Sequence, residues 1–429
     1  MSQTLRIGIA GLGTVGAGTL NLLRENAEMI AARAGATLQV VAVSMRDASK
    51  KRDVALDGIR VVSDATTLAD ADDIDIIVEV IGGQEGVAKT LIERAIANGK
   101  HVVTANKALI AHHGHALAQA AEARGVVLAF EAAVAGGIPI IAALRSGLAA
   151  NRITRVAGIL NGTCNYILTT MASEGRDFAD VLADAQQLGY AEADPSFDVD
   201  GIDAAHKTAI LASLAFGTRP DFARMHIEGI RRITLRDIEY AASFGYTVKL
   251  LGIASMEDGK LLQRVHPCLV PNGSPLAVIP GSFNAVQVEG NAVGRVVFEG
   301  RGAGAGPTAS AVVADLIAIA RGDRYAPFTV KADALHAAEP AALDAHAGCY
   351  YLRLSLKDEP GVLAEFTRAF AEQSISVHSI TQRAVIAGHS AQVIVITHDT
   401  SEAAVKRAAD TIAKLPVSVE PPVVLRIEP

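Results

Sequence analysis

Hydrophobic and polar positions alternate regularly along the first 130 residues, where short apolar runs are separated by longer amphipathic stretches. The apolar runs predict strands at 5–10, 38–44, 74–81, 101–104 and 126–130, and the stretches between them predict helices at 14–32, 86–97 and 108–124. Strands that alternate with helices favour a parallel, doubly wound sheet. In such sheets, ligands bind beyond the carboxyl ends of the strands.

The pattern changes in the middle of the chain. A strand is predicted at 153–160, a turn at Asn161-Gly162-Thr163, helices at 165–173, 178–188 and 204–215, and mixed strands and loops from 231 to 297. The glycine-rich stretch 300–310 then leads into a helix at 311–320. We expect this helix to return the chain to the first domain, over about 308–325. Because glycines have so little side-chain bulk, the stretch 300–310 could lie against a ligand. A tight crossing between domains is the alternative interpretation.

The last part of the chain forms a separate pattern. Residues 332–349, rich in alanine and histidine, are interpreted as a linker. Strands are predicted at 350–356, 375–383, 391–397 and 418–427, with a hairpin at Gly388 and helices at 362–373 and 401–415. The order βαββαβ is ferredoxin-like. The predicted division is therefore a Rossmann domain (1–130), an α+β domain (131–307), the linker, and a C-terminal domain (350–429).

Composition narrows the classes of function. The 429 residues are 50% hydrophobic and 20% charged, with a net charge of −7. This balance is globular and argues against nucleic acid as a main partner. Cys164, Cys268 and Cys349 have no paired spacing, which favours a reducing compartment without structural zinc. No apolar run is long enough to cross a membrane, and the N-terminus lacks a signal peptide, so we expect a cytoplasmic protein.

A glycine motif follows the first predicted strand. The sequence Gly11-Leu12-Gly13-Thr14-Val15-Gly16 stands between that strand and a helix. Gly11 permits a tight turn, Gly13 lets the backbone approach a pyrophosphate, and Gly16 lets the helix pack closely on the strand. The helix N-terminus adds free N–H groups for the phosphates. The motif predicts a dinucleotide site, with Gly82, Gly83, Thr104, Asn106 and Lys107 at the ends of neighbouring strands.

The end of the second predicted strand bears on the choice of dinucleotide. Arg46 follows this strand, and Lys50, Lys51 and Arg52 are close behind. Basic side chains there suit a ribose 2′-phosphate and favour NADP, whereas an acid suits NAD. Because Asp47 is also present, NAD and a merely solvated basic loop stay open.

Acidic residues and a lysine gather where an apolar helix begins. The segment Gly189-Tyr190-Ala191-Glu192-Ala193-Asp194-Pro195 runs on to Asp198, Asp203 and Lys207. Asp203 and Lys207 are spaced i, i+4, so they share one face of a helix. A lysine paired with an acid at this position can donate a proton and stabilise an oxyanion. A solvated salt bridge is the alternative.

Histidines cluster at His112-His113-x-His115. Such a cluster raises the possibility of a metal site, but no further ligand has recognisable spacing. We interpret it as the solvated start of a helix.

Taken together, these motifs resemble the homoserine dehydrogenases, in the monofunctional form with a C-terminal ACT domain. The resemblance covers nearly the whole chain. It rests on the glycine motif, Thr104-Ala105-Asn106-Lys107, residues 130–139, Asn161-Gly162-Thr163, Gly189 to Lys207 and Gly302 to Ser310. The Gly189–Lys207 stretch is the specific part, because many dehydrogenases share the glycine motif.

The resemblance implies an activity and roles for individual residues. The family reduces L-aspartate 4-semialdehyde to L-homoserine, reversibly, with NADPH or NADH. Glu192 would hold the substrate's α-ammonium group, and Asp198, Gly189 and Tyr190 would lie around the substrate. Asp203 and Lys207 would contact the reacting oxygen, with Lys107 beside the nicotinamide; Gly302 would contact the cofactor. Either lysine suits the proton donor; we favour Lys207, with Lys107 polarising the carbonyl.

The resemblance also implies two regulatory or structural sites. Glu131 and the carbonyls of Val134, Gly136 and Ile138 match a monovalent cation site, usually sodium; a local cap by Glu131 is the alternative. In the ACT domain, effector contacts would cluster at Asp358, Pro360, Gly361 and Val362, with L-threonine as the natural candidate. A structural or dimerising domain is the other interpretation, and Asp358 also suits a turn.

Two further functions compete with the dehydrogenase. An acylating semialdehyde dehydrogenase would need an activated cysteine, for which Cys164 is the one tempting thiol. A catalytically silent sensor of dinucleotide and amino acid would have no need of Lys107, Glu192, Asp203 and Lys207 together. The family pattern implies a homodimer or homotetramer, with part of the interface around 131–150 and 285–310.

Overall fold

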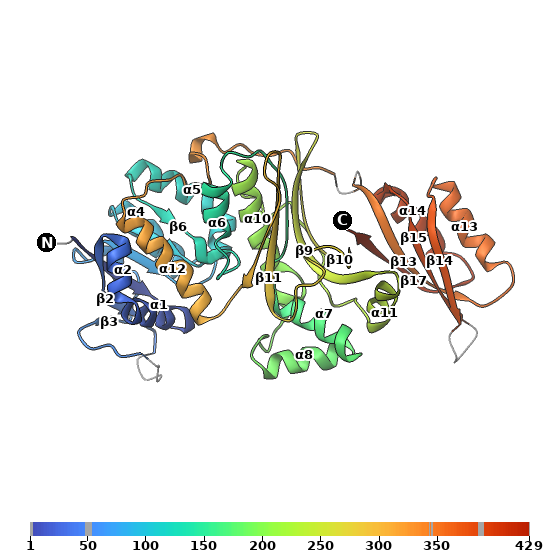
Figure 1. The fold of residues 1–429 in the computed structure, drawn as a ribbon, viewed down its shortest axis with the longest axis horizontal. Coiled ribbons are helices and arrows are strands. Elements are labelled where there is room, and N and C mark those ends of the chain that lie inside the picture. The colour runs from blue at the N-terminus through green and yellow to red at the C-terminus, as the bar shows by residue number, and fades with distance from the viewer. Residues whose placement is uncertain (1–2, 48–53, 343, 345, 385–389, 429) are drawn as a thin grey trace.

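The structure, a computed structural model, describes residues 3–47, 54–342, 344, 346–384 and 390–428. Three lobes follow one another along the long axis of the molecule (Figure 1). Lys50, Lys51, Arg52 and the Gly388 hairpin, all named from the sequence, lie outside the described residues.

The first lobe contains the parallel sheet that the sequence predicts. Its strand order is β3-β2-β1-β4-β5-β6. The strands are β1 (Gln3–Ala10), β2 (Ala36–Ser44), β3 (Arg60–Val62), β4 (Ile76–Glu79), β5 (His101–Thr104) and β6 (Leu128–Ala129). The helices are α1 (Thr14–Glu25), α2 (Ala27–Ala34), α3 (Thr67–Asp70), α4 (Val87–Ala97) and α5 (Lys107–Arg124). The doubly wound prediction is confirmed.

Two details of this lobe differ from the prediction. The helix predicted at 14–32 is interrupted at Asn26, whose φ of −111° and ψ of 21° leave the helical region. Asparagine competes with the helix by hydrogen-bonding nearby backbone groups, so it favours such a break. The helix α12 (Ala305–Ala320) begins six residues before the predicted start at 311. Pro307 does not prevent this, because proline is tolerated in the first turn of a helix.

The helix α12 returns to the first lobe and packs beside α1, as its place among the blue elements shows (Figure 1). Its Val312 and Leu316 are fully buried and share a core with Ile7 and Ile9 of β1. A Cβ at Gly18 would lie 2.9 Å from the Ala305 carbonyl oxygen, so the small residue permits this close approach.

The middle lobe is a sheet covered by helices. Its strands are β7 (Ile153–Ile159), β9 (Tyr246–Glu257), β10 (Lys260–Pro271), β11 (Phe283–Gly290) and β12 (Gly294–Arg301). These five strands pair with one another antiparallel, in the order β12-β11-β7-β9-β10. The helices include α6 (Ile140–Ala142), α7 (Gly162–Glu174), α8 (Phe178–Gln187), α9 (Ser196–Val199) and α10 (Ile202–Phe216). The helix α10 packs on β7, β9 and β10.

One helix of the middle lobe lies where only strands and loops were predicted. The helix α11 (Leu235–Ser243) follows Thr234, whose hydroxyl accepts a hydrogen bond from the Asp237 N–H. The Asp237 carboxylate in turn accepts from the Thr234 N–H, at 3.1 Å. This reciprocal capping box was a readable signal for a helix start that the sequence analysis missed.

The third lobe confirms the predicted βαββαβ order. It consists of β13 (Ala347–Lys357), α13 (Val362–Glu372), β14 (Val377–Ala384), β15 (Ser390–Thr397), α14 (Glu402–Ala413) and β17 (Ser418–Ile427), with the short β16 (Thr400–Ser401) against β13. The sheet order is β17-β13-β15-β14. The aromatic rings of Phe366 and Phe370 from α13 fill its core.

The middle and last lobes share one sheet, which the sequence did not predict. Cys268 and Leu269 of β10 pair in parallel with Arg426 and Ile427 of β17. Together with the short β8 (His226–Ile227), which pairs with β10, the strands of both lobes form one continuous sheet of eleven strands among the described residues. The interpreted linker also packs on the middle lobe, where Leu335 is buried. None of the helices in the described ranges has the length and apolar character needed to cross a bilayer.

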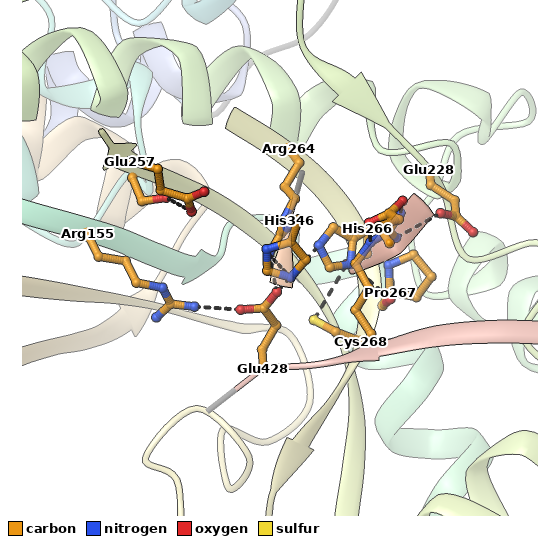
Figure 2. A network of polar contacts seen from close by, with 12 residues as sticks. Arg155, Glu228, Glu257, Arg264, His266, Pro267, Cys268, His346 and Glu428 are labelled. Atoms are coloured by element: carbon orange, nitrogen blue, oxygen red, sulfur yellow. Dashed lines mark hydrogen bonds and ion pairs between the residues drawn. The ribbon is translucent and has the colours of Figure 1, made fainter. Parts of the chain in front are cut away.

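A buried ionic network reinforces this junction (Figure 2). The Glu428 carboxylate accepts from Arg264 of β10 at 2.5 Å and from Arg155 of β7 at 2.9 Å. His346 lies 3.2 Å from the same Arg264 guanidinium. The Arg264 and Glu428 side chains are 2% and 5% exposed. The last strand is therefore fixed to the middle lobe by charges that water scarcely reaches.

Candidate active site

The site is centred on the buried helix α10. Asp203 and Lys207 stand one turn apart, with the Lys207 Nζ 2.8 Å from Asp203 Oδ2. The same ammonium donates to the Leu160 carbonyl oxygen at the end of β7, at 2.6 Å. Both side chains are more than nine-tenths buried. The pair expected from the i, i+4 spacing is therefore present, and it is a buried pair rather than a solvated one.

A second lysine reaches the same aspartate from the first lobe. Lys107 is the first residue of α5, and its Nζ lies 2.8 Å from Asp203 Oδ1. Asn106 caps this helix by accepting from the Leu109 N–H at 3.1 Å, while its own N–H donates to the Thr104 hydroxyl. The caps fix the start of α5, and with it the direction of Lys107, which is one-third exposed.

Asn161 organises the acids of the site, a role that sequence reasoning missed. Its side-chain N–H groups donate to Asp198 Oδ1 at 2.7 Å and to Asp203 Oδ2 at 2.8 Å. Its side-chain oxygen accepts from the Cys164 N–H and caps α7. An asparagine directly before a helix was the readable signal for the cap. Its contacts with the two acids depend on segments distant in sequence.

The charges of this cluster are strongly coupled. Burial alone raises the pKa of Asp203, but Lys207 and Lys107 outweigh burial and hold it far below the usual range. Burial lowers the pKa of Lys207, and Asp203 offsets this only in part. At Lys107 burial acts in the same direction, but the attraction of Asp203 prevails and raises its pKa. The two lysines therefore differ in acidity, although both bind the Asp203 carboxylate.

The residues expected around the substrate lie on the segment before α10. Asp198 is half-buried, and burial followed by repulsion from Asp203 raises its pKa. Tyr190, which follows Gly189, is held through its carbonyl oxygen by the Thr163 hydroxyl at 2.7 Å. Glu192 is exposed, and its carbonyl oxygen accepts from Gln186 at 3.0 Å. The structure thus places Asp198 beside Asp203 and leaves the Glu192 side chain at the surface.

The glycine motif forms a cradle of the kind that a dinucleotide requires. Gly11 has a φ of +100°, which favours glycine. A Cβ at Gly16 would lie 2.0 Å from the Gly11 carbonyl oxygen, whereas one at Gly13 would meet no atom within 4 Å. Open space at Gly13 borders the N-terminus of α1, which has no side-chain cap. Leu12, Thr14 and Val15 complete this turn, and the residues present fit a pyrophosphate.

The rim of the cradle includes an acid that sequence reasoning did not single out. Glu79 at the end of β4 is fully buried, and its carboxylate accepts from the Ile81 and Gly82 N–H groups and from the Thr104 hydroxyl. It therefore fixes two strand ends that were predicted to line the cofactor. Arg46 lies two residues after the end of β2 and is exposed.

The loop before α12 approaches the middle lobe closely. A Cβ at Gly302 would lie 2.2 Å from the buried Asn284 side chain, and one at Gly136 would lie 2.7 Å from the Gly302 carbonyl oxygen. This geometry explains the lack of side chains there: the glycine-rich stretch allows a tight crossing between lobes, which was the alternative interpretation. The same crossing brings Gly302 to the end of β12, next to the returning helix.

The residues expected to bind a cation differ in whether their oxygens already accept hydrogen bonds. Both carboxylate oxygens of Glu131 accept hydrogen bonds, from the Ile141 and Ala142 N–H groups at 2.9 and 2.7 Å, which is the local cap considered as the alternative. Ile138 accepts from the Ile140 N–H. The carbonyl oxygens of Val134 and Gly136 accept no hydrogen bond from any residue in the described part of the chain.

The clustered histidines face different partners. His113 pairs with Glu85 at 2.6 Å, His115 lies 3.1 Å from the Ala332 carbonyl oxygen, and His112 lies 3.3 Å from His206. Within the described ranges, no group of three or more His, Cys, Asp or Glu side chains has the arrangement of a metal site.

The expected effector turn lies in the third lobe, remote from Asp203. Asp358 accepts from the Gln382 side chain at 3.2 Å, and Pro360 and Gly361 lead into α13, which begins at Val362. Gly361 has a φ of +95°, so the turn needs glycine.

Known proteins match this chain throughout its length. The homoserine dehydrogenase family model matches residues 139–317, the model of the NAD binding domain of homoserine dehydrogenase matches 11–131, and the ACT domain model matches 350–417. Homoserine dehydrogenase from Pseudomonas aeruginosa is 46% identical and that from Neisseria gonorrhoeae 44%, each over 99% of both chains. The chain belongs to the homoserine dehydrogenase family. It is therefore an oxidoreductase with a nicotinamide dinucleotide-binding domain.

Solved homoserine dehydrogenases share this fold. The crystal structure from Thiobacillus denitrificans has a TM-score of 0.94 at 46% identity and covers 99% of this chain and 98% of its own. The Staphylococcus aureus structure at pH 7.5 has a TM-score of 0.78 at 33% identity over both full chains. A hyperthermophilic archaeal homoserine dehydrogenase in complex with NADPH, 30% identical over 74% of this chain, has a TM-score of 0.62. The three-part architecture is thus that of homoserine dehydrogenases with an ACT domain.

Proposed function

We propose that this chain catalyses the reversible, NAD(P)H-dependent reduction of L-aspartate 4-semialdehyde to L-homoserine. The observation that carries the proposal is the cluster of Lys107, Asp203 and Lys207, which places two ammonium groups on one carboxylate where the first and middle lobes meet. When bound at the glycine motif, a reduced nicotinamide dinucleotide would supply the hydride for the aldehyde carbon. The oxygen gains negative charge and then a proton, and both needs are met by lysine ammonium groups.

Lys207 is the better candidate for the proton donor. Its burial lowers its pKa, so it gives up a proton more readily than an ordinary lysine, while Asp203 keeps part of its positive charge. Lys107, whose pKa is raised, stays charged and polarises the carbonyl. Asp203 holds both ammonium groups in place, and Asn161 fixes Asp203. In the reverse direction neutral Lys207 takes the hydroxyl proton of homoserine.

The substrate's charged ends would be held outside the lysine cluster. We propose that Glu192 binds the α-ammonium group, with Asp198 and the Gly189–Tyr190 turn shaping the space around it. Support comes from the position of this segment, which is tied to α7 through Thr163 and to the cluster through Asn161. Because the Glu192 side chain is exposed, it has to turn inward over the substrate.

For the cofactor we propose a preference for NADP. Arg46 lies at the end of β2, where a basic side chain suits the 2′-phosphate. The rate with NADPH and NADH in wild type and in Arg46→Gln tests this. A loss of NADPH preference in the variant supports it, and an unchanged ratio contradicts it.

Feedback by L-threonine is proposed at the turn of Asp358, Pro360, Gly361 and Val362. Support comes from the ACT match and from the position of this turn at the start of α13. Asp358→Ala should remove threonine inhibition and leave basal turnover intact. Inhibition that survives this change assigns the effector elsewhere.

We further propose a monovalent cation beside Val134 and Gly136, whose carbonyl oxygens have no partner in the described part of the chain. Oxygen-only ligation suits such an ion. Thermal stability in sodium chloride against choline chloride at equal ionic strength checks this, because an ion that binds the folded state raises the melting temperature.

The proposed assembly is a homodimer or homotetramer. The edge strand β12 pairs with β11 on one side only among the described residues, which favours a partner on its other side. Light scattering on the purified protein measures the mass.

The activity itself is tested by following reduced-cofactor absorbance with L-homoserine and NADP or NAD. Turnover without phosphate supports the proposal. A requirement for phosphate would favour the acylating dehydrogenase, and normal cofactor binding without turnover would favour the sensor. The geometry argues against the acylating enzyme, because Cys164 is fully buried and burial raises the pKa of its thiol well above the usual value.

A further inference from the structure

A cavity of about 270 Å³ lies between the middle and third lobes. Its volume is close to the lower end of small-molecule sites, roughly 300 Å³. One wall comes from the segment Glu228–Ile233 together with Pro267, and the other from Tyr350, α14 and β17. Glu228 and Pro267 lie at one end of the junction network (Figure 2). The cavity thus belongs neither to the lysine cluster nor to the turn at Asp358.

Two polar groups of this cavity lack partners. Tyr350 is 1% exposed, and its hydroxyl has no hydrogen-bond partner in the described structure. A buried hydroxyl without a partner costs free energy unless a ligand or water supplies one. Arg232 is exposed at the cavity and forms no ion pair or side-chain hydrogen bond with any described residue. A tyrosine hydroxyl and a free guanidinium are the groups that bind a carboxylate.

The other charges of the cavity are partly neutralised. Glu402 binds both Arg426 and Lys406, at 2.8 and 3.2 Å. Glu228 faces Arg426 at 3.4 Å and His226 at 3.8 Å, both through Oε2, and its side chain is 39% exposed. Glu228 therefore keeps an accessible carboxylate oxygen for a cation. A ligand with one carboxylate and one ammonium group complements Arg232 and Glu228 together.

The remaining walls are apolar. Ile233, Pro267, Val405 and Leu425 are buried and line the cavity with aliphatic surface. Such walls favour an apolar side chain on the ligand over a hydroxylated one. We propose that this cavity binds a small apolar α-amino acid, with its carboxylate on Arg232 and the Tyr350 hydroxyl and its ammonium group on Glu228.

One wall of the cavity contacts the part of the chain that carries the substrate-binding residues, so a ligand there can affect catalysis. The Ile230 N–H donates to the Val199 carbonyl oxygen at 2.8 Å, and a Cβ at Gly229 would lie 2.2 Å from the same oxygen. Val199 ends the short helix that carries Asp198 and precedes α10. A ligand that bridges Arg232 to the third lobe therefore holds the segment that packs directly on the substrate-binding residues. Binding should change the KM for substrate more than kcat.

The test is titration calorimetry on the full-length protein without substrate, so that its outcome does not depend on turnover. The probes are L-isoleucine, L-valine and 3-methyl-2-oxopentanoate, which keeps the carboxylate and lacks the ammonium group. We expect the amino acids to bind and Arg232→Gln to weaken binding roughly tenfold or more, since a charge-assisted contact is lost. Tyr350→Phe should weaken it several-fold, and Glu228→Gln should abolish the advantage of the amino acid over the oxo acid.

Arg236→Gln is the matched control, because it removes an exposed arginine of α11 that does not line the cavity. Its binding should equal that of the wild type. Absence of binding by all three probes at roughly 10 mM overturns the proposal. Binding that Arg232→Gln and Tyr350→Phe leave unchanged, but that Asp358→Ala removes, also overturns it and assigns the ligand to the turn.

Discussion

Lys107 and Lys207 bind opposite oxygens of one carboxylate, that of Asp203, each at 2.8 Å. They come from different lobes, and their environments shift their pKa values in opposite directions. Because a buried charge needs a partner, Asp203 links the dinucleotide-binding lobe electrostatically to the helix that carries the substrate residues.

Replacing Lys207 should abolish hydride transfer without preventing cofactor binding. Lys207→Met removes the proposed proton donor, and the loss of general acid catalysis should lower kcat by about 10²–10⁴-fold. The cofactor lies in the first lobe, so its Kd should stay unchanged in a fluorescence titration. Lys100→Met is the control, because this buried lysine donates to the Ala71 and Ile74 carbonyl oxygens of the first lobe. A kcat close to wild type in Lys207→Met would assign the proton to another group.

The pH dependence should identify the proton donor. Reduction needs a protonated lysine, so its rate falls as pH rises through the pKa of that lysine. If Lys207 donates, the alkaline limb lies below the usual lysine value of 10.5, since burial lowers this pKa. A limb above 10.5 points instead to Lys107, whose pKa is raised. In Asp203→Asn, loss of the carboxylate removes a contribution that raises both values, so the limb should move to lower pH. Initial rates across pH in both directions measure this.

Cys164 should be dispensable for the chemistry. Its thiol is fully buried, and its Sγ lies 3.2 Å from the Asp198 carbonyl oxygen. Cys164→Ser keeps a donor of similar size, so turnover should fall less than about tenfold, with no dependence on phosphate. Cys268→Ser serves as the control for the loss of a buried thiol remote from Asp203. Complete loss of turnover in Cys164→Ser alone would restore the acylating alternative.

Gly13 and Gly16 should respond differently to the same added methyl group. In Gly16→Ala the Cβ would meet the Gly11 carbonyl oxygen at 2.0 Å, so the melting temperature should fall. Gly13→Ala adds its Cβ to open space, and the protein should stay as stable as wild type. The same methyl group then stands where the pyrophosphate approaches, so the Kd for NADP should rise. Thermal unfolding and cofactor titration separate the two effects. Equal affinity in Gly13→Ala and wild type would remove the pyrophosphate from this turn.

Glu428 should contribute strongly to stability. Glu428→Gln leaves the Arg264 and Arg155 guanidinium groups without their shared anion, and breaking a buried pair costs roughly 3–5 kcal/mol. Glu420→Gln, on the strand β17 that ends one residue before Glu428, is the control, because the Glu420 side chain is 61% exposed and lies 3.9 Å from its partner Arg353. Urea unfolding of the two variants should differ by most of this energy. Equal midpoints would show that the network is energetically neutral.

The fold could be predicted from the sequence wherever local pattern and tertiary structure agree. The apolar runs gave the parallel sheet and the βαββαβ order, because a strand buried on both faces and an amphipathic helix carry their own periodicity. The apolar runs did not predict the helix α11, where the capping box of Thr234 and Asp237 was overlooked. They also misplaced the start of α12, because Gly306 and Pro307 are untypical of a helix.

The candidate site likewise has parts that the local sequence predicts and parts that depend on tertiary packing. The sequence by itself determined the glycine motif and the pairing of Asp203 with Lys207, because both depend on spacing within a single turn or helix. Only the tertiary structure decided that Lys107 and Asn161 meet the same aspartate, and that β17 completes the sheet of the middle lobe. Contacts between residues far apart in the chain leave no periodicity in the sequence, since they arise only when separate elements pack together.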